Sequence, residues 1–210
     1  YCFTKCFGFS FRNCNYKTLH NLMETISAYI VAGGKSSRMG SDKGMLFLND
    51  TVFIEHIVKA LQEADIQNIS IVSANKAYDF LNCNRIEDIF PDKGPVGGIF
   101  TALSHSETEQ NVILSVDIPL ISSEIITWLI SNINYKKLIT QVKVGDKTSP
   151  LIAVYNRKAV NVFEEHIKRE ELKLRMVVEA IPHQTIEVPK KWHSLLQNIN
   201  TKEEYQNLIK

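Results

Sequence analysis

One stretch near the start of the chain, residues 28–48, restricts the fold more than any other part of the sequence. It reads AYIVAGGKSSRMGSDKGMLFL. Its apolar start is typical of a buried strand, and the chain breaks at Gly33-Gly34, where the missing side chains let another group approach the backbone. Three cations follow: Lys35, Arg38 and Lys43. A strand end, a loop of small residues and clustered cations together favour a bound anion, above all a polyphosphate.

This loop differs from two common phosphate-binding loops. Counting from either glycine, no Gly-Lys-Ser/Thr stands at the offset of a Walker A loop, and the GxGxxG pattern is absent as well. Gly-Gly by itself also fits a tight turn between a strand and a helix, with solvated basic residues around it. The loop therefore favours a phosphate site without deciding its class.

The segment GGKSSRMGSDK resembles the signature loop of the nucleotidyltransferases related to MobA, whose pattern is roughly L-A-G-G-x-S-x-R-M-G-x-D-K. The matching positions are Ala32, Gly33, Gly34, Ser36, Arg38, Met39, Gly40, Asp42 and Lys43. Val31 stands where the pattern has Leu. The resemblance extends over nearly the whole chain, from about Ile26 to Leu208, and implies a three-layer, Rossmann-like nucleotidyltransferase fold with a mainly parallel sheet.

Length and charge indicate one ordinary globular domain. A chain of 210 residues can bury a full core, and its formal net charge of +1 gives no basic field that would favour nucleic acid. No apolar run approaches the roughly 18 residues that span a bilayer. We therefore expect a single domain over residues 23–210, with neither nucleic acid nor a membrane as a partner.

Residues 1–22 differ from the rest of the chain. They hold three of the four cysteines, Cys2, Cys6 and Cys14, and show neither helical nor strand periodicity. Because Met23 precedes the first strand as a natural start would, we expect a non-native or disordered extension. The alternative is a small metal site, although the cysteine spacing fits no zinc pattern. A single remaining cysteine, Cys83, points to a reducing compartment, so we expect a cytoplasmic protein.

Apolar runs alternate with helical patterns along the chain, which predicts an α/β domain around a mainly parallel sheet. We expect strands at 26–31, 69–73, 85–88 and 112–116, and a hairpin of 138–144 with 151–155. We expect helices at about 53–64, 97–105, 157–168 and 174–180, one that begins at Ser122 or Ser123, and a last helix with a Thr201–Glu204 capping box.

Four residues follow the predicted parallel strands: Gly33, Ser73, Asp88 and Asp117. Ligands of open α/β sheets bind outside the carboxyl ends of the strands. We therefore expect these residues to line one shared crevice.

Asp117 is the strongest candidate for catalysis. It closes a buried apolar run, where a carboxylate is unfavourable unless it is paired or bound to a cation. Mg²⁺ favours one or two carboxylates together with substrate phosphates. The alternative, a cap for the helix near Ser122, is separated from that helix by Pro119 and Leu120. VDIPL at 116–120 resembles the family motif C-D-M-P-F-L, which implies that Asp117 binds Mg²⁺ and contacts the nucleotide phosphates.

The resemblance also implies the other nucleotide contacts. Arg38 and Lys43 would offset the charge of a triphosphate and its pyrophosphate leaving group, which suits a planar guanidinium and a compact ammonium; the alternative is two solvated surface cations. Further nucleotide contacts are implied for Val31, Ala32, Gly33, Gly34, Ser73 and Asp88. Relatives often carry Asn where this chain has Ser73, with Asn75 two residues later.

Three more segments resemble the family. GPVGG at 94–98 is similar to its G-P-L-x-G loop. SPLIAVY at 149–155 and NINT at 198–201 are similar to segments that we place, as hypotheses, near the acceptor site.

The resemblance implies a molybdenum cofactor guanylyltransferase activity. The terminal phosphate of molybdopterin would attack the α-phosphate of GTP, and pyrophosphate would leave. GTP and molybdopterin are then the substrates, Mg²⁺ is the cofactor, and transient contacts with molybdopterin-delivering or molybdoenzyme proteins are expected. The alternatives are a cytidylyltransferase or other nucleotidyltransferase of the same fold, and a non-catalytic chaperone that binds molybdopterin or nucleotide.

Overall fold

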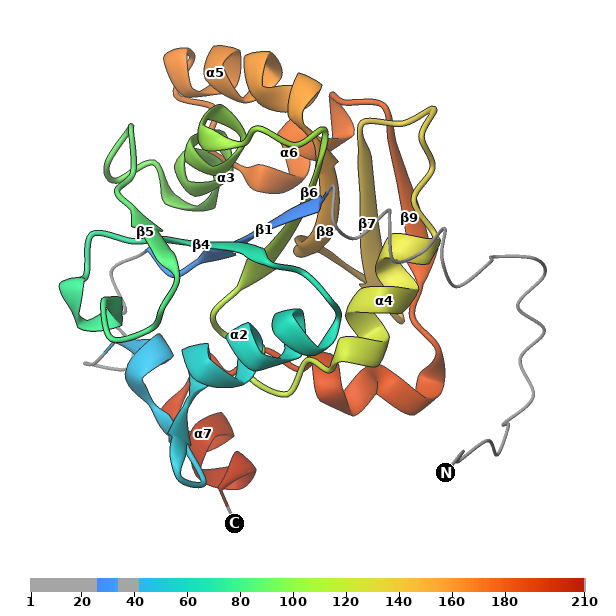
Figure 1. Cartoon of the computed structure of the whole chain (residues 1–210). Helices are drawn as coiled ribbons and strands as arrows, with labels where there is room; N and C mark the ends of the chain where they lie inside the picture. The colour runs from blue at the N-terminus through green and yellow to red at the C-terminus, as the bar shows by residue number, and fades with distance from the viewer. Residues whose placement is uncertain (1–25, 34–41, 210) are drawn as a thin grey trace.

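The computed structural model describes residues 26–33 and 42–209 (Figure 1). The predicted extension, residues 1–22, and the loop residues Gly34 and Arg38 lie outside the described residues. Within the described ranges, no helix combines the length and the apolar character needed to cross a bilayer.

A seven-stranded sheet forms the centre of the fold, in the order β5-β4-β1-β6-β8-β7-β9. Its strands are β1 (Ile26–Val31), β4 (Asn68–Val72), β5 (Asn84–Ile86), β6 (Gln110–Ser115), β7 (Ile139–Val144), β8 (Lys147–Asn156) and β9 (His183–Glu187). Pairing is parallel from β5 through β6 and between β7 and β9, whereas β8 runs antiparallel to both of its neighbours. The predicted mainly parallel sheet is confirmed.

Helices cover both faces of this sheet (Figure 1). The helices on one face are α3 (Gly94–His105), α5 (Val160–Lys168) and α6 (Leu174–Glu179), and those on the other are α2 (Phe53–Glu63) and α4 (Ser123–Ser131). Strand β1 explains the two cores, because its side chains alternate: Ala28 and Ile30 join the cluster under α2 and α4, and Tyr29 and Val31 join the cluster under α3 and α5. A strand buried on both faces is apolar at nearly every position, as this one is except at Ser27.

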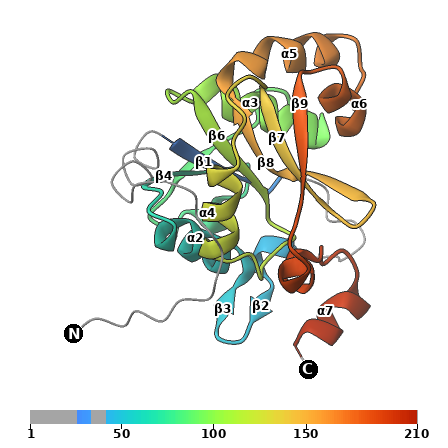
Figure 2. The same cartoon turned by 90° about the vertical axis from the view of Figure 1, so that its right-hand side faces the viewer.

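A short hairpin and the last helix lie side by side away from the sheet (Figures 1 and 2). The hairpin is β2 (Phe47–Leu48) with β3 (Thr51–Val52), and the helix is α7 (Lys202–Leu208). The Tyr205 hydroxyl donates to the Phe47 carbonyl at 2.8 Å, and its ring lies edge-on to Phe53 at 5.9 Å. The predicted Thr201–Glu204 capping box begins α7. These contacts hold α7 against residues 46–53.

The fold differs from the prediction in several places: β5 ends at Ile86, β8 begins at Lys147, and a 3-10 turn at 157–159 precedes α5. Two further differences concern β9 and α3. Strand β9 has the sequence HQTIE and lacks an apolar run, but it pairs with β7, and Gln141 Nε2 donates to Thr185 Oγ1 at 3.0 Å. Helix α3 begins at Gly94, three residues before the predicted start, because Pro95 fits the first turn of a helix.

Candidate active site

The loops that follow the first parallel strands open at one edge of the sheet. Three main-chain hydrogen bonds link them: Ala32 N to Val72 O at 3.1 Å, Ser73 N to Ile86 O at 2.9 Å, and Val116 N to Val31 O at 3.3 Å. The carboxyl ends of β1, β4, β5 and β6 therefore meet, as the sequence predicted.

Gly33 and Asp88 approach each other at this edge. A Cβ atom on Gly33 would lie 3.1 Å from Asp88 Oδ2, closer than most side chains tolerate. Asp88 is half-buried, and burial raises the pKa of its carboxyl; the hydrogen bond from Thr101, at 3.4 Å, partly opposes that rise. A Cβ on Gly98 would lie 2.8 Å from Val31 Cγ1. The missing side chain at Gly33 leaves the end of β1 accessible, and the missing side chain at Gly98 lets α3 pack closely against Val31.

The predicted nucleotide contact Ser73 is buried, and the protein already engages its hydroxyl. Ser73 Oγ donates to the Ala32 carbonyl at 3.5 Å and accepts from Asn75 N at 3.1 Å. The Arg85 guanidinium donates to the Ser73 carbonyl at 3.1 Å. Ser73 therefore shapes the loop after β4, and Asn75, two residues later, carries a side-chain amide.

Lys43 lies in a 3-10 turn, Lys43–Met45, whose cap is Asp42: the Asp42 carboxylate accepts from Gly44 N at 3.0 Å. The Lys43 ammonium is half-buried and donates to Asn200 Oδ1 at 2.7 Å. A Cβ on Gly44 would lie 2.8 Å from Val116 Cγ2. This turn therefore packs against the residue before Asp117, which places Lys43 and Asp117 on neighbouring segments.

Asp117 carries an unpartnered oxygen. Its Oδ2 accepts from Asn198 Nδ2 at 3.3 Å and its carbonyl from Ile199 N at 2.8 Å. Its Oδ1 is buried and has no hydrogen-bond partner among the described residues. A buried carboxylate oxygen left in this way is unfavourable unless a cation or donor reaches it.

The single Asp117 carboxylate is a ligand of the kind that Mg²⁺ takes. It provides too few ligands for a metal that the protein alone would hold. Within residues 26–33 and 42–209, no group of three or more His, Cys, Asp or Glu side chains could hold an ion. Mg²⁺ is usually bound by one or two carboxylates plus substrate phosphates and water. One carboxylate such as Asp117 would be enough for Mg²⁺ only where a nucleotide supplied the other ligands.

Residues 197–201, here the C-terminal segment, reach this site from the far end of the chain. The sequence placed part of it near the acceptor; the structure lays Asn198 against Asp117 and Asn200 against Lys43. Ile199 anchors the segment by packing with Leu48 and Phe53. Asn200 N also donates to Glu204 at 2.7 Å, a bond that lowers the pKa of that carboxyl.

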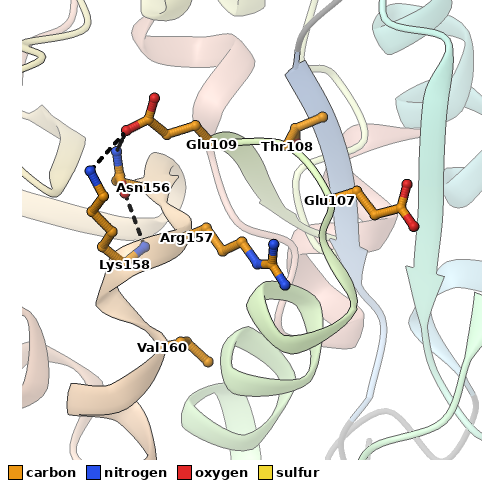
Figure 3. Close-up of a pocket in the computed structure, with 7 residues that line it drawn as sticks. All are labelled: Glu107, Thr108, Glu109, Asn156, Arg157, Lys158 and Val160. Atoms are coloured by element: carbon orange, nitrogen blue, oxygen red, sulfur yellow. Dashed lines mark hydrogen bonds and ion pairs between the residues drawn. The ribbon is translucent and has the colours of Figure 1, made fainter.

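A separate cavity of about 530 Å³ lies at the opposite edge of the sheet (Figure 3). Thr108 in its wall accepts from Ser27 N at 3.2 Å, at the amino end of β1. Glu109 accepts from Asn156 at 3.1 Å and Lys158 at 3.4 Å, so these polar groups satisfy one another. Among the residues that the structure describes, none of the predicted site residues lines this cavity.

The structure thus brings Ala32, Gly33 and Ser73 to the edge that also carries Asp88, Lys43 and Asp117. Gly34 and Arg38 lie outside the described residues, and their roles stay predictions. Sequence reasoning assigned no role to Asp42 or Tyr78, and it did not place Asn198 and Asn200 beside the candidate catalytic residues. A local pattern marks only Asp42, an Asp two residues before a glycine in a turn.

Comparisons with known proteins identify the family of this chain. The family model described as a MobA-like NTP transferase domain matches residues 28–186. A Flavobacterium johnsoniae protein named "Probable molybdenum cofactor guanylyltransferase" is 44% identical over 186 residues, which cover 89% of this chain and 97% of that protein.

Two crystal structures have similar folds. One, of an Aquifex aeolicus protein, is 27% identical with a TM-score of 0.73, covering 85% of this chain and 95% of that one. The other, molybdopterin-guanine dinucleotide biosynthesis protein A of Archaeoglobus fulgidus, is 22% identical with a TM-score of 0.73, over 87% and 96% of the two chains; at that identity it supports the fold alone. The family model and the Flavobacterium relative both cover most of the chain, which therefore belongs to the MobA-like NTP transferase family.

Proposed function

We propose that this chain transfers GMP from GTP to the terminal phosphate of molybdopterin, forming a guanine dinucleotide cofactor and releasing pyrophosphate. The name of the 44% identical relative supports this activity, because the match spans nearly the full length of both chains. The observation that carries it in the structure is the buried, unpartnered Oδ1 of Asp117, at the sheet edge where Gly33 leaves the backbone open.

Three groups would act on the triphosphate. Asp117 would hold Mg²⁺, whose charge would offset that of the phosphate oxygens it binds. Lys43 would exchange the Asn200 oxygen for a phosphate oxygen and stabilise the negative charge that builds on pyrophosphate. Gly33 would allow the phosphates to approach the main chain after β1. Gly34 and Arg38 enter this proposal through the sequence motif.

No general base is needed. The nucleophile is a phosphate oxygen, and a phosphate monoester, whose second pKa is about 6, is already largely ionised near neutral pH. The site must therefore align the two phosphates and offset their mutual repulsion, which are the main demands of phosphoryl transfer.

The reversed strand β8 supports the place of the acceptor. Ile152 pairs with Leu114 of β6, so β8 begins at the edge where β6 ends. Ser149 and Pro150, in the first half of β8, consequently lie on the side of Asp117. Molybdopterin would bind along this side, within reach of a nucleotide on the loops after β1 and β4.

The test supplies purified protein with Mg²⁺, molybdopterin and either GTP or CTP, and measures pyrophosphate release. Release with GTP well above that with CTP supports the proposal, and chelation of Mg²⁺ should abolish it. Release with CTP instead would make the chain a cytidylyltransferase. Nucleotide binding by calorimetry without release at any acceptor concentration would favour a cofactor chaperone.

The proposal includes a cellular setting. We place the enzyme in the cytoplasm, where its nucleotide is available, and expect transient contacts with proteins that deliver molybdopterin or receive the finished cofactor. Pull-down of such proteins with and without GTP would test these contacts.

A further inference from the structure

Asp42 is the centre of a hydrogen-bond network beneath the Lys43 turn. Its carboxylate accepts from Gly44 N at 3.0 Å, from Asn75 Nδ2 at 2.6 Å and from the Tyr78 hydroxyl. Asn75 and Tyr78 belong to the loop after β4, more than 30 positions along the chain. A carboxylate that accepts three donors from two segments fixes one segment against the other.

Tyr78 is suited to a fixed donor role. It is fully buried, and burial together with the neighbouring Asp42 raises the pKa of its phenol, so the hydroxyl keeps its proton. It ends the 3-10 helix Lys76–Tyr78, whose cap is Asn75.

Asn75 uses both ends of its amide. Its Oδ1 accepts from Ala77 N at 2.9 Å and caps the short helix, while its Nδ2 donates to Asp42. Its main-chain N–H donates to Ser73 Oγ. The strand end at Ser73 is thus joined to Asp42 through a single residue.

The packing around Gly44 is also close. A Cβ atom at this position would overlap the Tyr78 hydroxyl and would also meet Val116 Cγ2 at 2.8 Å. The turn that presents Lys43 therefore rests on Tyr78 and on the residue before Asp117.

From these contacts we infer that Tyr78 and Asn75 are positioning residues: they hold Asp42, and Asp42 holds the turn that presents Lys43. The inference rests on the proposed function for its kinetic effect, since Lys43 is the group proposed to meet the triphosphate. Neither residue needs to touch substrate. Both act by setting where the Lys43 ammonium lies when the phosphates arrive.

The first test is Tyr78→Phe, which removes one donor to Asp42 and keeps the ring. We expect kcat to fall about tenfold, since small misplacements of a catalytic group are costly, while KM for GTP changes less than about threefold. The control is Tyr29→Phe, which removes another buried phenol hydroxyl, one bonded to Ser106 at the opposite edge of the sheet. Its kcat should match the wild type; equal kcat in Tyr78→Phe would overturn the inference.

The second test is Asn75→Asp, which keeps the cap for Ala77 and sets a second carboxylate against Asp42. Two carboxylates in contact share a proton at lower pH. We expect a larger loss of kcat than in Tyr78→Phe at about pH 8, and partial recovery relative to wild type at about pH 6. A ratio of variant to wild-type activity that does not change with pH would contradict the role of Asp42.

A crystal structure of Tyr78→Phe separates this inference from the proposed function. It should place the Lys43 ammonium beyond hydrogen-bond distance of Asn200 Oδ1, or with a changed turn at 43–45. If the wild type transfers no nucleotide, the proposed function fails, yet this structure still decides the positioning role. An unmoved Lys43 turn would overturn it whatever the activity.

Discussion

The ammonium of Lys43 lies 2.7 Å from the side-chain oxygen of Asn200, although 157 positions separate the two residues. Two neighbouring residues hold Asn200 in this position: Asn198 contacts the Asp117 carboxylate, and Ile199 is buried against the hairpin. The C-terminal segment thus forms one side of the candidate site. The donor-side groups of that site come from the first 120 residues. The family model ends at residue 186, before this segment begins.

The first prediction concerns this pair. Lys43→Met should lower kcat/KM about a hundredfold, because one lost donor at a developing anion has effects of that size. Asn200→Ala should lower it about tenfold, by loosening the lysine. Because the residues are in contact, the double variant should resemble Lys43→Met alone. The measurement is kcat/KM from steady-state pyrophosphate release for the wild type, the two single variants and the double variant. If the free-energy losses of the single variants add fully in the double variant, the two residues act separately.

The second prediction concerns Asp117→Asn. Transfer should fall at least about a hundredfold, because the amide cannot replace a carboxylate toward Mg²⁺ and phosphates. Stability should change by less than about 1 kcal/mol, since the shape is kept and the buried oxygen has no donor to lose. Glu63→Gln, an exposed change at the end of α2, is the control for removing one negative charge. Normal turnover by Asp117→Asn would end the enzymatic interpretation of this edge.

The third prediction tests how closely α3 fits β1. Gly98→Ala should destabilise the fold by about 1–2 kcal/mol through overpacking, despite the better helix propensity of Ala. The new methyl group would meet Val31 Cγ1 at 2.8 Å. Adding Val31→Ala removes that atom, so the double variant should lose less stability than the two single losses combined. Urea unfolding gives all the values, and strict additivity would contradict the contact.

The fourth prediction concerns Asp88 and pH. Burial raises the pKa of this carboxyl, so between its ordinary and its raised pKa the folded chain holds a proton that the unfolded chain has released. Stability from this group is therefore present below its ordinary pKa and is lost as pH rises through that interval. Asp88→Asn should be as stable as wild type in acid and more stable at neutral pH. Urea midpoints measured across pH check it, and parallel curves for the two proteins would refute it.

The sequence was a good guide to the sheet edge. Strand β1 was predicted with its observed bounds, because a strand buried on both faces is a continuous apolar run. The rule that ligands bind at the carboxyl ends of parallel strands predicted that Gly33, Ser73, Asp88 and Asp117 lie at one edge of the sheet. The structure places them there, and their roles stay predictions. Strand β9 was missed, since its polar sequence becomes a strand only by pairing with β7.

What the sequence did not predict depends on long-range contacts. Tyr78 meets Asp42 across 36 positions, and Asn198 meets Asp117 across 81. No periodicity or spacing encodes such a meeting, because it depends on how the layers pack after each element has formed. The sequence analysis noted Asn75 and the segment that contains Asn200, but their contacts with Asp42 and Lys43 follow from the same packing.

The single reversed strand has an architectural consequence. Strands β5, β4, β1 and β6 form one half of the sheet, and β8, β7 and β9 form the other; within the described sheet, the β6–β8 pair joins the two halves. If the two substrates lie on opposite halves, this seam sets the gap between donor and acceptor phosphates. A small sliding movement of β8 along β6 would then change the distance between the two phosphates, and with it the rate of transfer, without changing any residue that either substrate touches.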